Sequence, residues 1–176
     1  MKLKPTALIL SFAVLTSSCG APENWTREQQ ESITTRSFPG QSTAQIVEAA
    51  ETVLRLAGGE NIRFDYRSSG FVARRSAAAF FIIGGQLGDY VFDFSAQTGR
   101  AELRIIYNTS AVTTLGVLPA NTEVSQVEGS YALFFSRLAY LLGRNDTWVP
   151  CDNARRDLNL RTSFEALCLN APDLRP

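Results

Sequence analysis

The sequence predicts an α+β domain: a mainly antiparallel sheet of about four or five strands with two helices packed on one face, followed by a disulfide-stapled C-terminal tail. Three observations predict this fold. Two segments that alternate between apolar and polar residues are flanked by two segments with a helical apolar repeat. Short turns within the alternating segments require antiparallel neighbours. The polar tail contains two cysteines.

The first predicted helix covers residues 43–57. Ser42 and Gln45 have the spacing of a capping box, and Gly58-Gly59 ends the segment. Apolar residues recur on one face at helical spacing: Ile46, Ala49, Ala50, Val53, Leu54 and Ala57. We therefore expect one side of this helix to pack on the sheet and the other to face water.

Two β-hairpins are predicted next, because the apolar period changes from 3.6 residues to 2. The first joins residues 62–67 to a strand that begins at Phe71, through a turn at Ser68-Ser69-Gly70. The second turns at residues 97–100, and one of its faces is apolar: Tyr90, Phe92, Phe94, Leu103, Ile105 and Tyr107. The other face is charged and is expected to be solvated: Asp89, Asp93, Glu102 and Arg104.

Seven consecutive apolar residues, from Ala77 to Ile83, connect the two hairpins. Such a run is typical of a buried strand. The alternative is an exposed segment that contacts a partner, because a contiguous apolar patch usually marks an interface. The contact residues are then Phe80, Phe81, Ile82 and Ile83.

A second helix is predicted from Val124 to Leu142, with Gly143 as its stop. Its apolar stripe is expected to cover the aromatic face of the sheet: Val127, Tyr131, Phe134, Leu138 and Leu141. One further strand is compatible with the sequence of residues 112–118, before this helix.

The tail beyond residue 145 is polar, and we expect it to pack across one end of the domain. The alternative is a surface whose arginines bind a carboxylate or phosphate group: Arg155, Arg156 and Arg161. Thr162 and Glu165 have capping-box spacing, which indicates a short helix ending near Cys168.

The N-terminus has the order of a bacterial export signal. A basic start at residues 1–4 precedes a mainly apolar stretch from Pro5 to Leu15, which is too short to cross a bilayer. The following Thr16-Ser17-Ser18-Cys19 resembles the cleavage box of bacterial lipoproteins. The resemblance implies removal of residues 1–18 and acylation of Cys19. Because Gly20 follows, it also implies an outer-membrane location with the domain facing the periplasm. The alternative is ordinary signal-peptide cleavage after Ala21.

The cysteine count agrees with this interpretation, because three cysteines are an odd number for an exported protein. Lipidation of Cys19 leaves Cys151 and Cys168 to form a disulfide in the oxidising periplasm. By loop entropy this cross-link contributes about 3 kcal/mol to stability. The alternative is a pair of buried free thiols.

The composition excludes several classes of function. The chain has no histidine, and both lysines, Lys2 and Lys4, belong to the predicted signal. Catalysis by Ser-His-Asp, Cys-His or Schiff-base chemistry is therefore excluded, as is a histidine-ligated metal. The remaining fifteen arginines and seventeen acidic residues give a formal charge of −2, which argues against a nucleic-acid partner. We expect no cofactor and no metal site.

These features predict a signal peptide at residues 1–18, a lipid-anchored flexible tether at 19–40 and an α+β domain at 41–146. Residues 147–176 are expected to be a disulfide-stapled appendage of the same domain. Two details within the tether stay open. Trp25 is placed either at the membrane interface or against the domain, and residues 34–38 allow an edge strand.

The predicted function is a non-enzymatic, membrane-anchored lipoprotein that serves as an accessory or scaffold component of the bacterial envelope. Its expected partners are the membrane, through Cys19, and other envelope proteins. The alternative is a periplasmic small-ligand-binding lipoprotein that uses the aromatic sheet face and anion-binding arginines: Arg63, Arg74, Arg75 and Arg104. An enzyme that uses only carboxylates, Ser or Tyr ranks third.

Overall fold

The structure is a computed structural model that describes residues 24–58, 62–81, 84–113, 116–117, 121–158 and 167–168. Side chains are described for these residues except 58, 77–81, 84–87, 111–113 and 116–117. The helices in this part of the chain are α1 (Arg27–Thr34), α2 (Thr43–Gly58), α3 (Glu128–Leu141) and α4 (Cys151–Asp157). The strands in the same ranges are β1 (Thr35–Ser37), β2 (Ile62–Arg67), β3 (Gly70–Phe81), β4 (Gly84–Gln97), β5 (Arg100–Thr113), β6 (Gly116–Val117) and β7 (Asn121–Val124).

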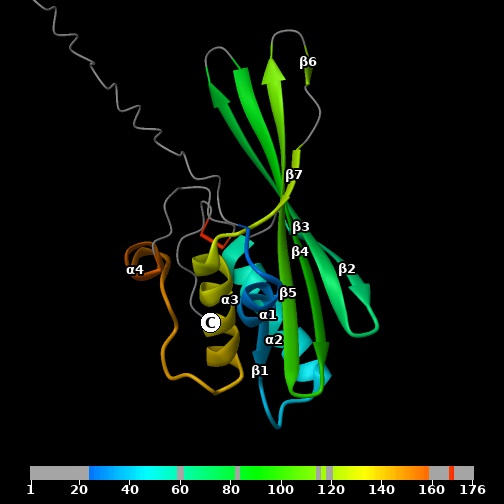
Figure 1. The fold of residues 1–176 in the computed structure, drawn as a ribbon, viewed down its shortest axis with the longest axis vertical. Helices are drawn as coiled ribbons and strands as arrows, with labels where there is room; N and C mark the ends of the chain where they lie inside the picture. Colours follow the sequence, from blue (N-terminus) through cyan, green and yellow to red (C-terminus); the bar gives the residue numbers. More distant parts are fainter. Residues whose placement is uncertain are drawn as a thin grey trace, which may run out of the picture.

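The strands form one antiparallel sheet in the order β1-β5-β4-β3-β2, and the short strands β6 and β7 also pair with β5 (Figure 1). Both predicted hairpins are present. Tyr66 lies opposite Phe71 across β2 and β3, and Phe94 lies opposite Leu103 across β4 and β5. Gly99 has a positive φ of 73° in the second turn, a conformation that favours glycine. The predicted α+β fold class is confirmed.

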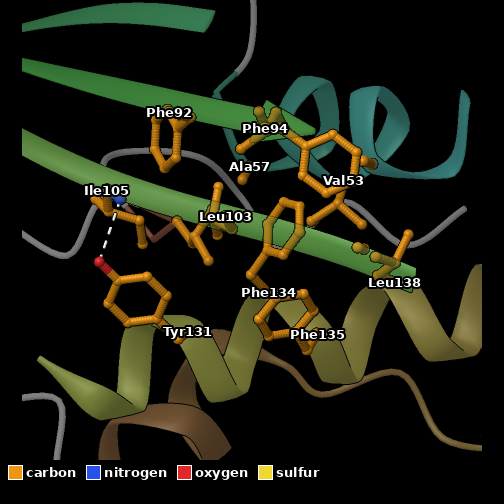
Figure 2. Packing of buried hydrophobic residues seen from close by; sticks show 14 of the residues in the cluster. Val53, Ala57, Phe92, Phe94, Leu103, Ile105, Tyr131, Phe134, Phe135 and Leu138 are labelled. Carbon is orange, nitrogen blue, oxygen red and sulfur yellow. Dashed lines mark hydrogen bonds between the residues drawn. The ribbon is translucent and has the colours of Figure 1, made fainter. Parts of the chain in front are cut away.

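The core lies between the apolar sheet face and helices α2 and α3. Phe94 is stacked on Phe71 with ring centroids 5.2 Å apart, and the ring of Phe134 from α3 lies 5.7 Å from Phe94. Figure 2 shows Val53 of α2 beside Phe94, and Phe134 reaching from α3 toward the strands. The predicted helix over residues 43–57 is confirmed by α2, whose apolar face is buried here.

A buried tyrosine ties α3 to the sheet. The backbone N–H of Ile105 donates to the Tyr131 hydroxyl at 3.2 Å, drawn as the dashed line in Figure 2. The same hydroxyl donates to the carbonyl of Ser125 at 3.0 Å. Burial raises the pKa of Tyr131, so the neutral form that can make both bonds is favoured.

Residues 24–38 differ from the expected flexible tether. Helix α1 begins with a capping box between Thr26 and Gln29, and β1 pairs with β5 as an edge strand. Ile33 and Phe38 lie in the core, and the Trp25 ring contacts Tyr131 with centroids 5.8 Å apart. The tether prediction is therefore wrong for these residues, because their few apolar side chains are buried by α3 and the sheet.

The second long helix starts later than predicted. Residues 121–124 form β7, which pairs with β5, and the N–H of Ser125 donates to the carbonyl of Ile105. The free edge of β5 thus pairs with Val124 and binds the N–H of Ser125, two residues that were assigned to the first helical turn, and α3 begins at Glu128. The strand expected at 112–118 is represented by the end of β5 and by β6.

The tail carries the predicted disulfide between Cys151 and Cys168, whose Cα atoms are 5.7 Å apart. Trp148, Ala154 and Leu167 are buried, so the described part of the tail packs against the domain. The short helix expected to end near Cys168 falls mainly on residues 159–166, outside the described residues.

Candidate binding surfaces

The arginines that the sequence nominates for anion binding do not share one surface. Arg63 and Arg74 lie opposite each other on β2 and β3, and both are exposed. Arg74 forms an ion pair with Asp65, and the Arg104 side chain lies 3.6 Å from a carboxylate oxygen of Glu102. These exposed pairs contribute little to stability.

Arg75 points into the core instead, with only 6% of its surface exposed. Its Nη1 donates to the carbonyl of Ala57 at 3.0 Å, close to the C-terminal end of α2. A guanidinium there satisfies a terminal carbonyl and complements the negative end of the helix dipole. Burial lowers the pKa of Arg75. Arg75 thus contacts the C-terminal end of α2 and does not share a surface with the exposed arginines.

The tail arginines are engaged locally. Arg155 donates to the carbonyl of Cys168 at 3.4 Å and lies 3.6 Å from Asp152. Arg156 pairs with Asp157 at 3.2 Å. Arg161 lies outside the described residues.

The predicted contact segment lies at the end of β3. Phe80 and Phe81 pair with Gly85 and Gly84 of β4, so this part of the run is a strand rather than a loop. Ile82 and Ile83 lie outside the described residues. Strand β2 covers β3 only from Gly70 to Arg75. Within the described ranges, residues 76–81 therefore have β4 on one side and no strand on the other.

The two edges of the sheet differ in this respect. The outer edge of β5 is covered in succession by β1, the contacts of Tyr131 and Ser125, β7 and β6. The outer edge of β2 carries exposed charged residues, which discourage pairing with another chain: Arg63, Asp65 and Arg67. The segment 76–81 has neither protection, because its sequence Ser-Ala-Ala-Ala-Phe-Phe is uncharged.

This open edge belongs to the end of the sheet that extends away from the helices, as Figure 1 shows for β3, β4 and β5 above the level of β7. The base of this extension is ordered by aromatic contacts. The Tyr107 ring stacks on Tyr90 with centroids 4.6 Å apart, and it lies over Gly88, where a Cβ atom would come within 2.8 Å of it. Burial raises the pKa of Tyr107.

A second surface was missed by sequence reasoning. A cavity of about 440 Å³ lies between the segment 36–39 and α3, next to Arg36 and Arg144. It was missed because residues 19–40 were assigned to a tether. The capping box at Thr26 and Gln29, followed by the isolated Ile33 and Phe38, was the signal in the sequence that could have indicated a folded segment there.

Among the residues that the structure describes, no group of three or more His, Cys, Asp or Glu side chains is placed to hold a metal ion. The described helices include none with the length and apolar character needed to span a bilayer. Comparison with protein-family models, curated proteins and solved structures gives no match for this sequence.

Proposed function

We propose that the chain is a non-enzymatic lipoprotein, anchored to the bacterial outer membrane through Cys19, that acts as an accessory or scaffold component of the envelope. We propose further that it binds a partner envelope protein along residues 76–81 of β3. The observation that carries this proposal is the uncharged strand edge that no described strand covers.

The chemistry of a strand edge supports such an interaction. An uncovered edge presents backbone N–H and C=O groups that can pair with an extended segment of another protein. Six residues without charge or proline are a suitable template for such pairing. The proposed occupant is an extended, uncharged segment of the partner, added to the sheet beside β3.

The folded start of the domain supports a position close to the membrane. The described structure begins at Asn24, and Trp25 already packs on Tyr131. Four residues lie between Cys19 and Asn24, so five chain steps of at most about 3.6 Å each join them. A lipid on Cys19 would therefore hold the domain within about 20 Å of the bilayer.

The anchor is tested by the intact mass of the protein from a membrane fraction. We expect a mass of residues 19–176 plus acyl chains, with two cysteines that react with an alkylating reagent only after reduction. The matched variant Cys19→Ala should lose the acyl mass and keep the disulfide. An unlipidated soluble species from the unsubstituted gene would refute the anchor.

The contact is tested by photo-crosslinking in intact cells, with a photoreactive amino acid placed at Ala79 or, as a control on the same sheet, at Tyr66. We expect one reproducible envelope-protein adduct from position 79 and none from position 66. The double substitution Phe80→Ser and Phe81→Ser, introduced beside the photoreactive residue, should reduce the adduct at least fivefold with the domain still folded by circular dichroism.

Other results would contradict the contact. Equal crosslinking from both positions, or no protein adduct from position 79, would exclude the strand edge as the partner site. An adduct with the mass of two copies of this chain would show that the strand edge binds a second copy of the chain and not a different envelope protein. Unfolding of the double variant would assign Phe80 and Phe81 to the core.

A further inference from the structure

The cavity between the segment 36–39 and α3 has the size and lining of a small-molecule site. Its volume of about 440 Å³ is within the range of about 300–1,000 Å³ typical of ligand pockets. Apolar side chains make up most of the lining, and no acidic side chain contributes to it: Phe38, Pro39, Ala132, Phe135 and Ala139. The hydrophobic effect favours contact between this lining and an alkyl chain.

Two arginines stand beside this apolar lining. The Arg36 guanidinium lies 5.3 Å from the centroid of the Phe135 ring, and its Nη1 donates to the carbonyls of Ser32 and Thr35. Arg144 donates through Nη2 to the carbonyl of Pro39. Hydrogen bonds to backbone carbonyls thus hold both guanidinium groups at the cavity. Arg36 precedes α3 in the chain, and Arg144 follows it.

Neither charge is neutralised within the described part of the chain. Seven other arginines there lie within 4.0 Å of a carboxylate: Arg55, Arg67, Arg74, Arg100, Arg104, Arg155 and Arg156. Within the described residues, the hydrogen bonds of Arg36 and Arg144 go to carbonyls, which satisfy donors without cancelling charge. Their remaining N–H groups can receive an anion from solvent.

We propose that this cavity binds a single-tailed anionic amphiphile, with its carboxylate between Arg36 and Arg144 and its alkyl chain along the accessible apolar residues Pro39, Ala132 and Ala139. A fatty acid has this chemistry. The site goes beyond the scaffold function and is independent of it, because β1 and the C-terminal end of α3 lie at the other end of the molecule from the open edge of β3 (Figure 1).

The test uses the full chain in membranes and a dodecanoate that carries a photoreactive diazirine near the end of its alkyl chain. We expect labelling on peptides that contain residues 36–39 and 132–139, and competition by unlabelled dodecanoate. The corresponding photoreactive dodecanol should label these peptides at least fivefold less, because it lacks the charge. A photoreactive dodecyl phosphate distinguishes a general anion site from a carboxylate site. Stronger labelling by the phosphate would contradict the carboxylate ligand and indicate a phosphate ligand instead.

Variants separate the charge from the apolar lining. Arg36→Gln with Arg144→Gln should reduce labelling by dodecanoate at least fivefold, whereas Arg63→Gln on the exposed face of β2 should leave it unchanged. Ala132→Phe should reduce it by filling the cavity without a change of charge. Two results would overturn the proposal. One is equal labelling of the unsubstituted protein, the double variant and the Arg63 variant. The other is labelling spread over the whole chain of the folded protein. If the double variant unfolds at a lower temperature than the unsubstituted protein, the Ala132→Phe variant and the comparison with dodecanol still test the proposal.

Discussion

Replacing Arg137 with methionine is expected to lower the free energy of unfolding by about 3–5 kcal/mol. Arg137 is only 2% exposed. Its Nε donates to the carbonyl of Val149 at 3.0 Å, and its Nη1 donates to the carbonyl of Leu167 at 3.3 Å. The guanidinium also lies 4.8 Å from the Trp148 ring centroid. Methionine fills part of the volume but leaves these carbonyls without their charged donor.

The measurement is urea unfolding of the full chain followed by circular dichroism, with the disulfide intact. Arg104→Met is the matched control, because Arg104 is exposed and its contact with Glu102 is weak. The control should change stability by about 0.5 kcal/mol or less. For a chain of this size, the Arg137 variant should also melt roughly 6–20 °C earlier. Equal stabilities of the two variants would show that Arg137 does not hold the tail to α3.

Arg137 joins the two parts of the disulfide-bonded segment to the domain. Val149 precedes Cys151, Leu167 precedes Cys168, and Nη2 of Arg137 lies 3.3 Å from the sulfur of Cys151. The disulfide closes the segment on itself, whereas the guanidinium fastens it to α3. The number of cysteines in the sequence predicts the disulfide. The number of arginines does not indicate which of them is buried.

Position along the apolar stripe was nevertheless a usable signal. Arg137 follows Phe134 by three residues and precedes Leu141 by four, so helical spacing places it on the buried side of α3. In the same way, Arg75 is an even number of residues from Phe71 and Ala73 and shares their face of β3. Arginines were assigned by their chemistry rather than by their register, and Arg75 was therefore predicted as an anion contact.

The hairpins and α2 could be predicted because their signals are local. A period of two, a short turn and a period of 3.6 all act within about ten residues of sequence. The folding of residues 24–38 depends instead on distant partners: β1 pairs with β5, and Trp25 packs on Tyr131. The cavity beside Arg36 and Arg144 depends on the same long-range packing, and so it could not be predicted before that segment was placed.

Replacing Phe94 with alanine is expected to cost about 3–5 kcal/mol, because Phe94 is fully buried and a cavity would remain between the sheet and α3. Its ring contacts Phe71 on one side and Phe134 on the other, with centroids 5.2 and 5.7 Å away. Tyr66→Ala is the matched aromatic-to-alanine control on the neighbouring edge of the sheet. Tyr66 is 61% exposed, and its replacement should cost about 1 kcal/mol or less.

Urea unfolding of the two variants also separates two interpretations of the aromatic sheet face. If this face is the core, Phe94→Ala loses stability and the Tyr66 control does not. If it is instead a face that opens to receive a ligand, Phe94→Ala should leave the unfolding free energy close to that of the control and change only ligand binding. The burial of Phe94, Phe134 and Leu103 against one another predicts the first result, which would direct the search for ligands to the cavity beside α3.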